Sequence, residues 1–185
     1  MNTLRIKIIS LAIALMAITI NPFIAGAAVS CALDQQMWIN GGGDGFGGPN
    51  TPGQTFTPSA PGHVCKVVVW IHKNDAAAGP LTLRIRRHDL TPLPGGSQTI
   101  PGGAIPMGLS AQTFNFACAP LLAGSPFYGL TLEAPGSAPA AYTWINSDDA
   151  GADAAYPAGN GYYRAGGAWR RVGYDYAFKV YMCRP

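Results

Sequence analysis

Residues 174–182 read Y-D-Y-A-F-K-V-Y-M, and this short run carries the clearest indication of the fold. Every second residue from Tyr174 to Met182 is aromatic or aliphatic, and Asp175 and Lys179 are among the residues between them. Successive side chains of a β-strand point to opposite faces, so this alternation predicts an antiparallel strand with one face in the core. The sequence therefore indicates a β-sheet protein, and similar runs precede this one.

Short runs of strand-forming residues recur along the chain and are separated by turn residues. Such runs lie at 35–40, 54–57, 64–73, 81–87, 98–100, 113–118, 127–133, 142–146, 162–164 and 168–171. We expect 64–73 and 81–87 to form a β-hairpin and 41–53 to be a glycine-rich loop. With 24 Gly and 16 Pro, no run after the first 28 residues has a convincing helical period. The pattern predicts an all-β protein, a two-sheet antiparallel jelly-roll β-sandwich.

The first 28 residues have the order of a secretory signal peptide. Arg5 and Lys7 precede an apolar run, 8–20, and small residues follow at 25–28. The run is too short to span a membrane, so we expect 1–28 to be removed. Residues 29–185 then form a single domain that is secreted or held at the cell surface or in the periplasm. Lipidation of Cys31, which follows small residues, is an alternative.

Charge limits the classes of partner. Removal of the signal peptide takes away two of the 12 basic residues and none of the nine acidic ones, so the net charge falls from +3 to +1. A nearly neutral domain is not expected to bind nucleic acid or an acidic membrane surface.

The cysteines are even in number, which in an exported chain indicates two disulfides. They are Cys31, Cys65, Cys118 and Cys183. Four cysteines allow three pairings, among which the sequence alone does not choose. The pairing we expect joins Cys31 to Cys183, which ties the two ends together, and Cys65 to Cys118 across two strands. Their spacing does not fit a zinc site or a C-x-x-C redox pair.

Several segments, taken in order, resemble a known kind of module. They are GQTFTP (53–58), HVCKVVVWI (63–71), LLAGSPFYGLTL (121–132), YPAGNGYY (156–163) and YDYAFKVY (174–181). This order resembles the jelly-roll modules of bacterial secreted and surface proteins, which are similar to carbohydrate-binding modules. The resemblance covers 53–181 and consists mostly of strand cores and turns. It implies the fold and, as expectations, a glycan ligand and a bound calcium ion.

Aromatic and acidic residues gather between 142 and 171 and form the first candidate site. Exposed aromatic rings stack on the apolar faces of sugars, while Asp and Asn side chains hydrogen-bond to hydroxyls. Calcium takes about six to eight oxygen ligands, which clustered aspartates supply. The alternatives are a solvated acidic loop and tyrosines packed in the core. We expect glycan contacts from Trp144, Asp148, Asp149, Tyr156, Asn160, Tyr162, Tyr163 and Trp169, and calcium ligands at Asp148, Asp149 and Asp153.

The outward positions of the expected hairpin form a second candidate site. A tryptophan among cations suits an acidic polysaccharide, because arginine forks match carboxylate and sulfate groups. A solvated basic face is the alternative. The residues are Lys66, Trp70, His72, Thr82, Arg84 and Arg86.

The sequence lacks the catalytic motifs G-x-S-x-G and H-E-x-x-H. Glu133 and Asp175 are a candidate carboxylate pair for glycoside hydrolysis. We expect a secreted protein that is not an enzyme and whose partner is a polysaccharide or a surface glycan. The main alternative is a structural or adhesive subunit of a cell surface or filament, which engages proteins or associates with itself. An exported glycan hydrolase is the third hypothesis.

Overall fold

The computed structural model describes residues 30–38, 41–121, 127–147 and 156–184. Within these residues the chain forms two six-stranded antiparallel sheets and one short 3-10 helix, η1 (Gly102–Ala104). The predicted all-β, two-sheet sandwich is therefore confirmed. The predicted signal peptide lies outside the described residues.

Sheet A is built around one long strand, β4, which pairs with β7 along one edge and with β12 and β9 in turn along the other. The outer strands are β1, beside β12, and β2, beside β9. The bounds are β1 (Ser30–Met37), β2 (Gly43–Phe46), β4 (Gly62–Lys73), β7 (Gly108–Leu121), β9 (Tyr142–Ile145) and β12 (Phe178–Arg184).

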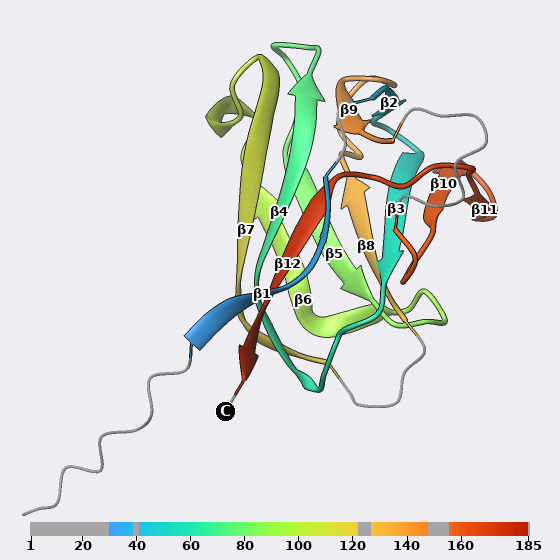
Figure 1. The fold of residues 1–185 in the computed structure, drawn as a ribbon. Helices are drawn as coiled ribbons and strands as arrows, with labels where there is room; N and C mark the ends of the chain where they lie inside the picture. Colours follow the sequence, from blue (N-terminus) through green and yellow to red (C-terminus); the bar gives the residue numbers. More distant parts are fainter. Residues whose placement is uncertain (1–29, 39–40, 122–126, 148–155, 185) are drawn as a thin grey trace, which may run out of the picture.

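Sheet B has the order β11-β10-β3-β8-β5-β6. Its bounds are β3 (Asn50–Phe56), β5 (Leu81–Arg86), β6 (Pro92–Ile100), β8 (Tyr128–Glu133), β10 (Gly161–Ala165) and β11 (Arg170–Arg171). Figure 1 shows the two layers, one containing β4, β7 and β12 and the other containing β3, β5 and β8.

The inner faces of the two sheets form the core. Alternate residues of the central strands are buried, as a half-buried strand requires. The strand predicted for 174–182 begins later, at Phe178 in β12, but the predicted alternation is confirmed from Tyr176 onward, because that side is buried. The fully buried residues include Val67, Val69, Ile71, Leu81, Leu83, Ile85, Tyr176, Phe178 and Val180.

The predicted hairpin between β4 and β5 does not form. β4 belongs to sheet A and β5 to sheet B, and the loop 74–80 carries the chain from one sheet to the other. This loop is held by the hydroxyl of Tyr142, which donates to the carbonyl of Gly79 at 2.6 Å. Each strand has one apolar face, and placing the strands in different sheets lets both faces cover the same core. The second candidate site is thereby divided, with Lys66, Trp70 and His72 on the outer face of sheet A and Thr82, Arg84 and Arg86 on that of sheet B.

The disulfide joins Cys31 to Cys65, so both predicted pairs, Cys31 with Cys183 and Cys65 with Cys118, are wrong. Cys31 and Cys183 do stand opposite each other in the register of β1 and β12. Cys183 is buried, however, whereas Cys31 is exposed and reaches β4 instead.

A bulge in β4 explains the error. Cys65 has no register partner in either β7 or β12. Strict alternation would place Cys65 on the same side as Val67 and Val64 on the opposite side. Val64 and Val67 are nevertheless both buried, so the alternation is interrupted between them. The extra residue therefore turns Cys65 toward the half-exposed outer side, where the disulfide to Cys31 forms.

The glycine-rich segment predicted as a loop contains β2 and the start of β3. Here glycine permits close approach to other segments. A Cβ at Gly43 would stand 2.4 Å from Cγ2 of Thr143, and one at Gly45 would stand 2.8 Å from Cβ of Ala140. Only glycine fits against neighbours this near, so these residues indicate close packing rather than a free loop. No helix among the described residues is long and apolar enough to cross a membrane.

Candidate functional site

The outer face of sheet B carries a continuous set of polar side chains. Pairing places Arg84 beside Thr131, Thr131 beside Gly53 and Gly53 beside Tyr162. Paired residues of antiparallel strands point to the same side, so these positions form one row across four strands. We call this surface the arginine face and define it by Thr51, Gly53, Thr82, Arg84, Arg86, Thr131, Glu133, Tyr162, Arg164 and Trp169.

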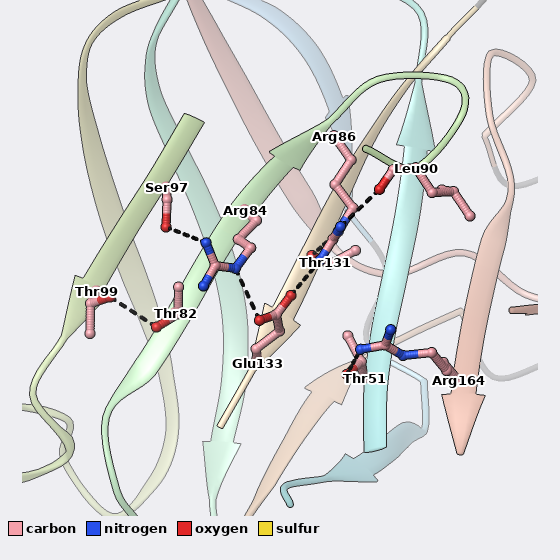
Figure 2. A network of polar contacts seen from close by, with 10 residues as sticks. All are labelled: Thr51, Thr82, Arg84, Arg86, Leu90, Ser97, Thr99, Thr131, Glu133 and Arg164. Carbon is pink, nitrogen blue, oxygen red and sulfur yellow. Dashed lines mark hydrogen bonds and ion pairs between the residues drawn. The ribbon is translucent and has the colours of Figure 1, made fainter. Parts of the chain in front are cut away.

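Glu133 is the centre of a network of polar contacts on this face (Figure 2). Its Oε2 accepts a hydrogen bond from Nε of Arg84 at 3.0 Å, and its Oε1 accepts one from Nη2 of Arg86 at 2.6 Å. Arg86 also donates from Nε to Oγ1 of Thr131 at 3.1 Å and from Nη1 to the carbonyl of Leu90 at 2.8 Å. Charge-assisted bonds of this kind fix the direction of both guanidinium groups.

The network also sets the charge of the face. Burial raises the pKa of the Glu133 carboxyl. The hydrogen bonds and positive charges of Arg84 and Arg86 lower it by more than burial raises it, so the pKa lies below the ordinary value. Glu133 is therefore ionised at neutral pH. Together with Arg164, the two arginines give the face an excess of positive charge and several donors for hydroxyl or carboxylate oxygens.

Trp169 and Tyr162 supply the aromatic part of the arginine face, and both are half-buried. The ring of Trp169 lies over Gly53, where a Cβ would stand 3.2 Å from its Cζ3 atom. The guanidinium of Arg164 lies 5.0 Å from the centre of the same ring, and its Nη2 donates to Oγ1 of Thr51 at 3.3 Å. The ring is thus held beside polar groups, an arrangement that suits a sugar with an apolar face and a rim of hydroxyls.

Trp144 and Tyr156 are buried, contrary to the prediction that they face a ligand, although Tyr156 also borders the groove that contains Asn160. Trp144 has none of its surface exposed, stacks on Tyr176 with ring centres 4.7 Å apart, and donates from Nε1 to the carbonyl of Ala177 at 2.9 Å. Tyr156 is 5% exposed, and its hydroxyl donates to Oε1 of Gln35 at 2.7 Å. Both rings stabilise the packing of the two sheets.

Tyr163 points to the inner side of sheet B, away from Tyr162. Its hydroxyl donates to the carbonyl of Gly45 at 2.7 Å. Nearby, the carboxylate of Asp44 accepts the hydroxyls of both Tyr174 and Tyr176. Burial raises the pKa of Tyr174, and the contact with Asp44 raises it by a smaller amount. The hydroxyl of Tyr174 therefore stays protonated and donates a hydrogen bond at neutral pH. This cluster ties β2 to β10 and to the residues just before β12, and it accounts for Tyr163 as a structural residue.

Asn160 lies in a groove that continues the arginine face beyond Gly53. The backbone N–H of Asn160 donates to Oγ1 of Thr55 at 2.7 Å, and its carbonyl accepts the N–H of Thr55 at 2.9 Å. The structure thus brings three predicted residues, Asn160, Tyr162 and Trp169, to one side of the protein. The groove is lined by Thr55, Thr57, Phe127, Tyr156, Pro157, Ala158, Gly159, Asn160 and Arg171.

Glu133 and Asp175, the candidate carboxylate pair, do not share a cleft. Glu133 lies on the outer face of sheet B, whereas Asp175 is buried on the inner side, where Nε2 of Gln54 donates to it at 2.8 Å. Burial raises the pKa of Asp175 above the ordinary value. The sheet separates the two groups, so they are not placed to act on one glycosidic bond.

The predicted calcium ligands Asp148, Asp149 and Asp153 lie outside the described residues. In the part of the chain that the structure describes, no group of three His, Cys, Asp or Glu side chains is placed to hold a metal ion.

The outer face of sheet A carries a second set of aromatic and basic residues, which we call the lysine–aromatic face: Trp38, Lys66, Trp70, Lys179 and Tyr181. Sequence reasoning identified Lys66 and Trp70 and missed the other three. The signal for two of them was present, because Lys179 and Tyr181 occupy the outward positions of the last strand. Trp38 follows the end of β1, and no alternation marks it.

Comparison of the chain with models of known protein families found no family that matches, and comparison with curated proteins found no match. The fold class and the geometry of these two faces are therefore the basis for assigning a function.

Proposed function

We propose that the protein is a secreted, non-catalytic glycan-binding protein and that the arginine face is its binding site. The observation that carries this proposal is the half-buried ring of Trp169, which lies over Gly53 and beside Arg164 on the same face as the network of Arg84, Arg86 and Glu133. Glycan sites combine an aromatic ring with a few fixed polar groups. Because these polar groups are already bonded to one another, less conformational entropy is lost when a ligand binds.

The strand order supports the jelly-roll form of the sandwich. Early strands pair with late ones in a nested way: β1 with β12, β3 with β8, β4 with β7 and β5 with β6. This nesting gives the rows β1-β12-β4-β7 and β3-β8-β5-β6, the arrangement of a ribbon of paired strands wrapped around a core. Such a fold leaves one broad outer face on each sheet.

Export is supported by the disulfide between Cys31 and Cys65, because such bonds persist in oxidising compartments. Calcium is proposed as a further component through Asp148, Asp149 and Asp153. Its test is a rise in the melting temperature in calcium relative to a chelator, since a ligand that binds only the folded state stabilises it.

A structural or adhesive role is the second candidate. The exposed apolar side chains Leu33, Trp38, Met107 and Leu109, which are 44–55% exposed, favour it, because exposed apolar groups mark surfaces that meet other molecules. Concentration-dependent assembly in sedimentation experiments without sugar would support this role. Hydrolysis is the weakest candidate, since Glu133 and Asp175 lie on opposite sides of sheet B.

The test of the proposed function is retention of the purified exported protein on a panel of neutral and acidic polysaccharides, in calcium and in a chelator. We expect retention on one class of polysaccharide, with weaker retention of Trp169→Ala at an unchanged melting temperature. Loss of retention in chelator would place calcium at the site. Failure of the protein to bind any member would contradict the proposal and favour the structural role.

A further inference from the structure

The lysine–aromatic face has aromatic rings that the fold does not require for its core. Trp38 is 54% exposed and meets Trp70 edge to face, with ring centres 4.4 Å apart. Trp70 projects from the outer side of β4, opposite the buried Val69 and Ile71. A tryptophan left this exposed in a soluble sandwich gains little from folding, so its place calls for another explanation.

Lysine side chains alternate with these rings. Nζ of Lys179 lies 5.6 Å from the centre of the Trp70 ring, and Nζ of Lys66 lies 3.9 Å from the centre of the Tyr181 ring. Strand pairing places Lys66 beside Tyr181 in one row and Lys179 beside Val68 in the next row. Both lysines therefore lie in adjacent rows of the same outer face. The cation–π contacts hold the ammonium groups close to the rings.

The outward positions that have register partners carry charge of one sign; Asp34, at the bulge of β1, has no register partner, and its carboxylate accepts hydrogen bonds from Ser59. The outward positions of the paired rows on β1, β4, β7 and β12 are Leu33, Gln36, Lys66, Val68, Trp70, His72, Leu109, Ala111, Thr113, Asn115, Lys179 and Tyr181, and no carboxylate is among these described residues. A second copy of the same face would bring lysines against lysines, which disfavours self-association here. Charge complementarity instead selects an anionic partner.

The spacing selects an extended partner with both rings and charges. Lys66 and Trp70 are four residues apart on β4, a distance of about 13 Å along a strand. A ligand that covers this face must present apolar surfaces and negative groups in turn. An acidic polysaccharide does so, because each sugar ring has an apolar face for stacking and a carboxylate or sulfate for a lysine.

We propose that the lysine–aromatic face is a second binding site and that its ligand is a strand of acidic polysaccharide. The site is on the opposite side of the sandwich from the arginine face, and it does not depend on the function proposed for that face. Both lysines act by charge, and Trp38 and Trp70 act by stacking.

The test compares retention on polygalacturonate and on neutral dextran of similar length. The double variant Lys66→Glu/Lys179→Glu is expected to bind polygalacturonate about tenfold more weakly or worse, because two attractive contacts become repulsive. Lys66→Arg/Lys179→Arg keeps both charges and is expected to bind nearly as well as the unaltered protein. Trp38→Ala is expected to weaken binding by about threefold or more, since stacking on one ring is lost.

The matched control is Arg87→Glu/Arg170→Glu, which changes the net charge equally at two exposed positions outside both faces. It is expected to bind polygalacturonate nearly as well as the unaltered protein. Melting temperatures of all variants establish that each is folded.

Four outcomes would overturn the proposal. The first is that the Lys66→Glu/Lys179→Glu variant and the control variant bind polygalacturonate equally well, and the second is that the unaltered protein is retained equally on neutral dextran and on polygalacturonate. The third is that the unaltered protein binds anionic lipid vesicles or a DNA duplex more tightly than polygalacturonate. The fourth is that it does not bind polygalacturonate at all. Trp169→Ala, measured in the same assay, separates the two sites. If it abolishes retention on polygalacturonate while the lysine reversal retains it, the acidic ligand belongs to the arginine face.

Discussion

The ring of Trp169 lies tightly against Gly53, and a Cβ at position 53 would stand 3.2 Å from Cζ3 of the ring. This contact is tighter than ordinary van der Waals packing, so the glycine determines how close the ring lies to β3. The position of Trp169 beside Tyr162 and Arg164 therefore depends on a residue with no side chain.

Gly53→Ala is expected to displace the Trp169 ring and to lower glycan affinity by about threefold or more, with a small effect on stability. Titration calorimetry and tryptophan fluorescence measure the two effects. Gly129→Ala is the control, because a Cβ at Gly129 would meet its nearest neighbour, Cβ of Arg86, at an ordinary 3.7 Å. Equal behaviour of the two variants would show that Trp169 is not positioned by Gly53.

Glu133→Gln is expected to destabilise the protein by about 1 kcal/mol at neutral pH, a value reduced for the partial exposure of the ion pairs. The folded-state pKa of Glu133 lies below its ordinary value of 4.5, so its contribution is present above that pH. The contribution is lost as the pH falls through the folded-state pKa. The difference in melting temperature between the variant and the unaltered protein should thus be smaller at pH 3 than at pH 7, and a difference of equal size at both would rule this account out.

Removal of the disulfide by Cys31→Ser is expected to cost about 3–4 kcal/mol, the loss predicted for a loop closed by cysteines 34 residues apart. Peptide mapping without reduction should recover Cys31 linked to Cys65. Recovery of Cys31 linked to Cys183 would contradict the structure.

Trp144→Ala is expected to destabilise the protein by about 3–5 kcal/mol, because it empties a fully buried site. Trp144→Phe keeps most of the packing and loses the hydrogen bond to the carbonyl of Ala177, at a cost of about 1 kcal/mol beyond the lost volume. Chemical denaturation measures both. A small effect of Trp144→Ala, similar to that of Trp169→Ala, would mean that the ring is not a core residue.

Alternation along single strands was the part of the fold that sequence could predict. The apolar side of the last strand, from Tyr176 to Met182, is buried as expected, and so are Leu83 and Ile85 of β5. Alternation states which side of a strand is apolar, but it does not state which strand lies beside it. For this reason the separation of β4 from β5 into two sheets was missed.

Single residues that break the alternation were not predictable. The bulge at Cys65 changes which cysteines meet, and nothing in the run from Val64 to Val67 marks it. Among the candidate ligand residues, Tyr162 and Trp169 reach the outer face, whereas Trp144 and Tyr156 are buried. All four are aromatic residues in or near short strands, and only the packing of the two sheets decides which rings stay at the surface.

The most direct test of the central claim is the affinity of the retained polysaccharide for the unaltered protein and for Trp169→Ala/Tyr162→Ala, measured by calorimetry beside the melting temperature of each. If the arginine face binds glycan, the double variant loses about tenfold or more in affinity and melts at nearly the same temperature. Unchanged affinity, or a melting temperature that falls together with affinity, would contradict the assignment of these rings to a binding site.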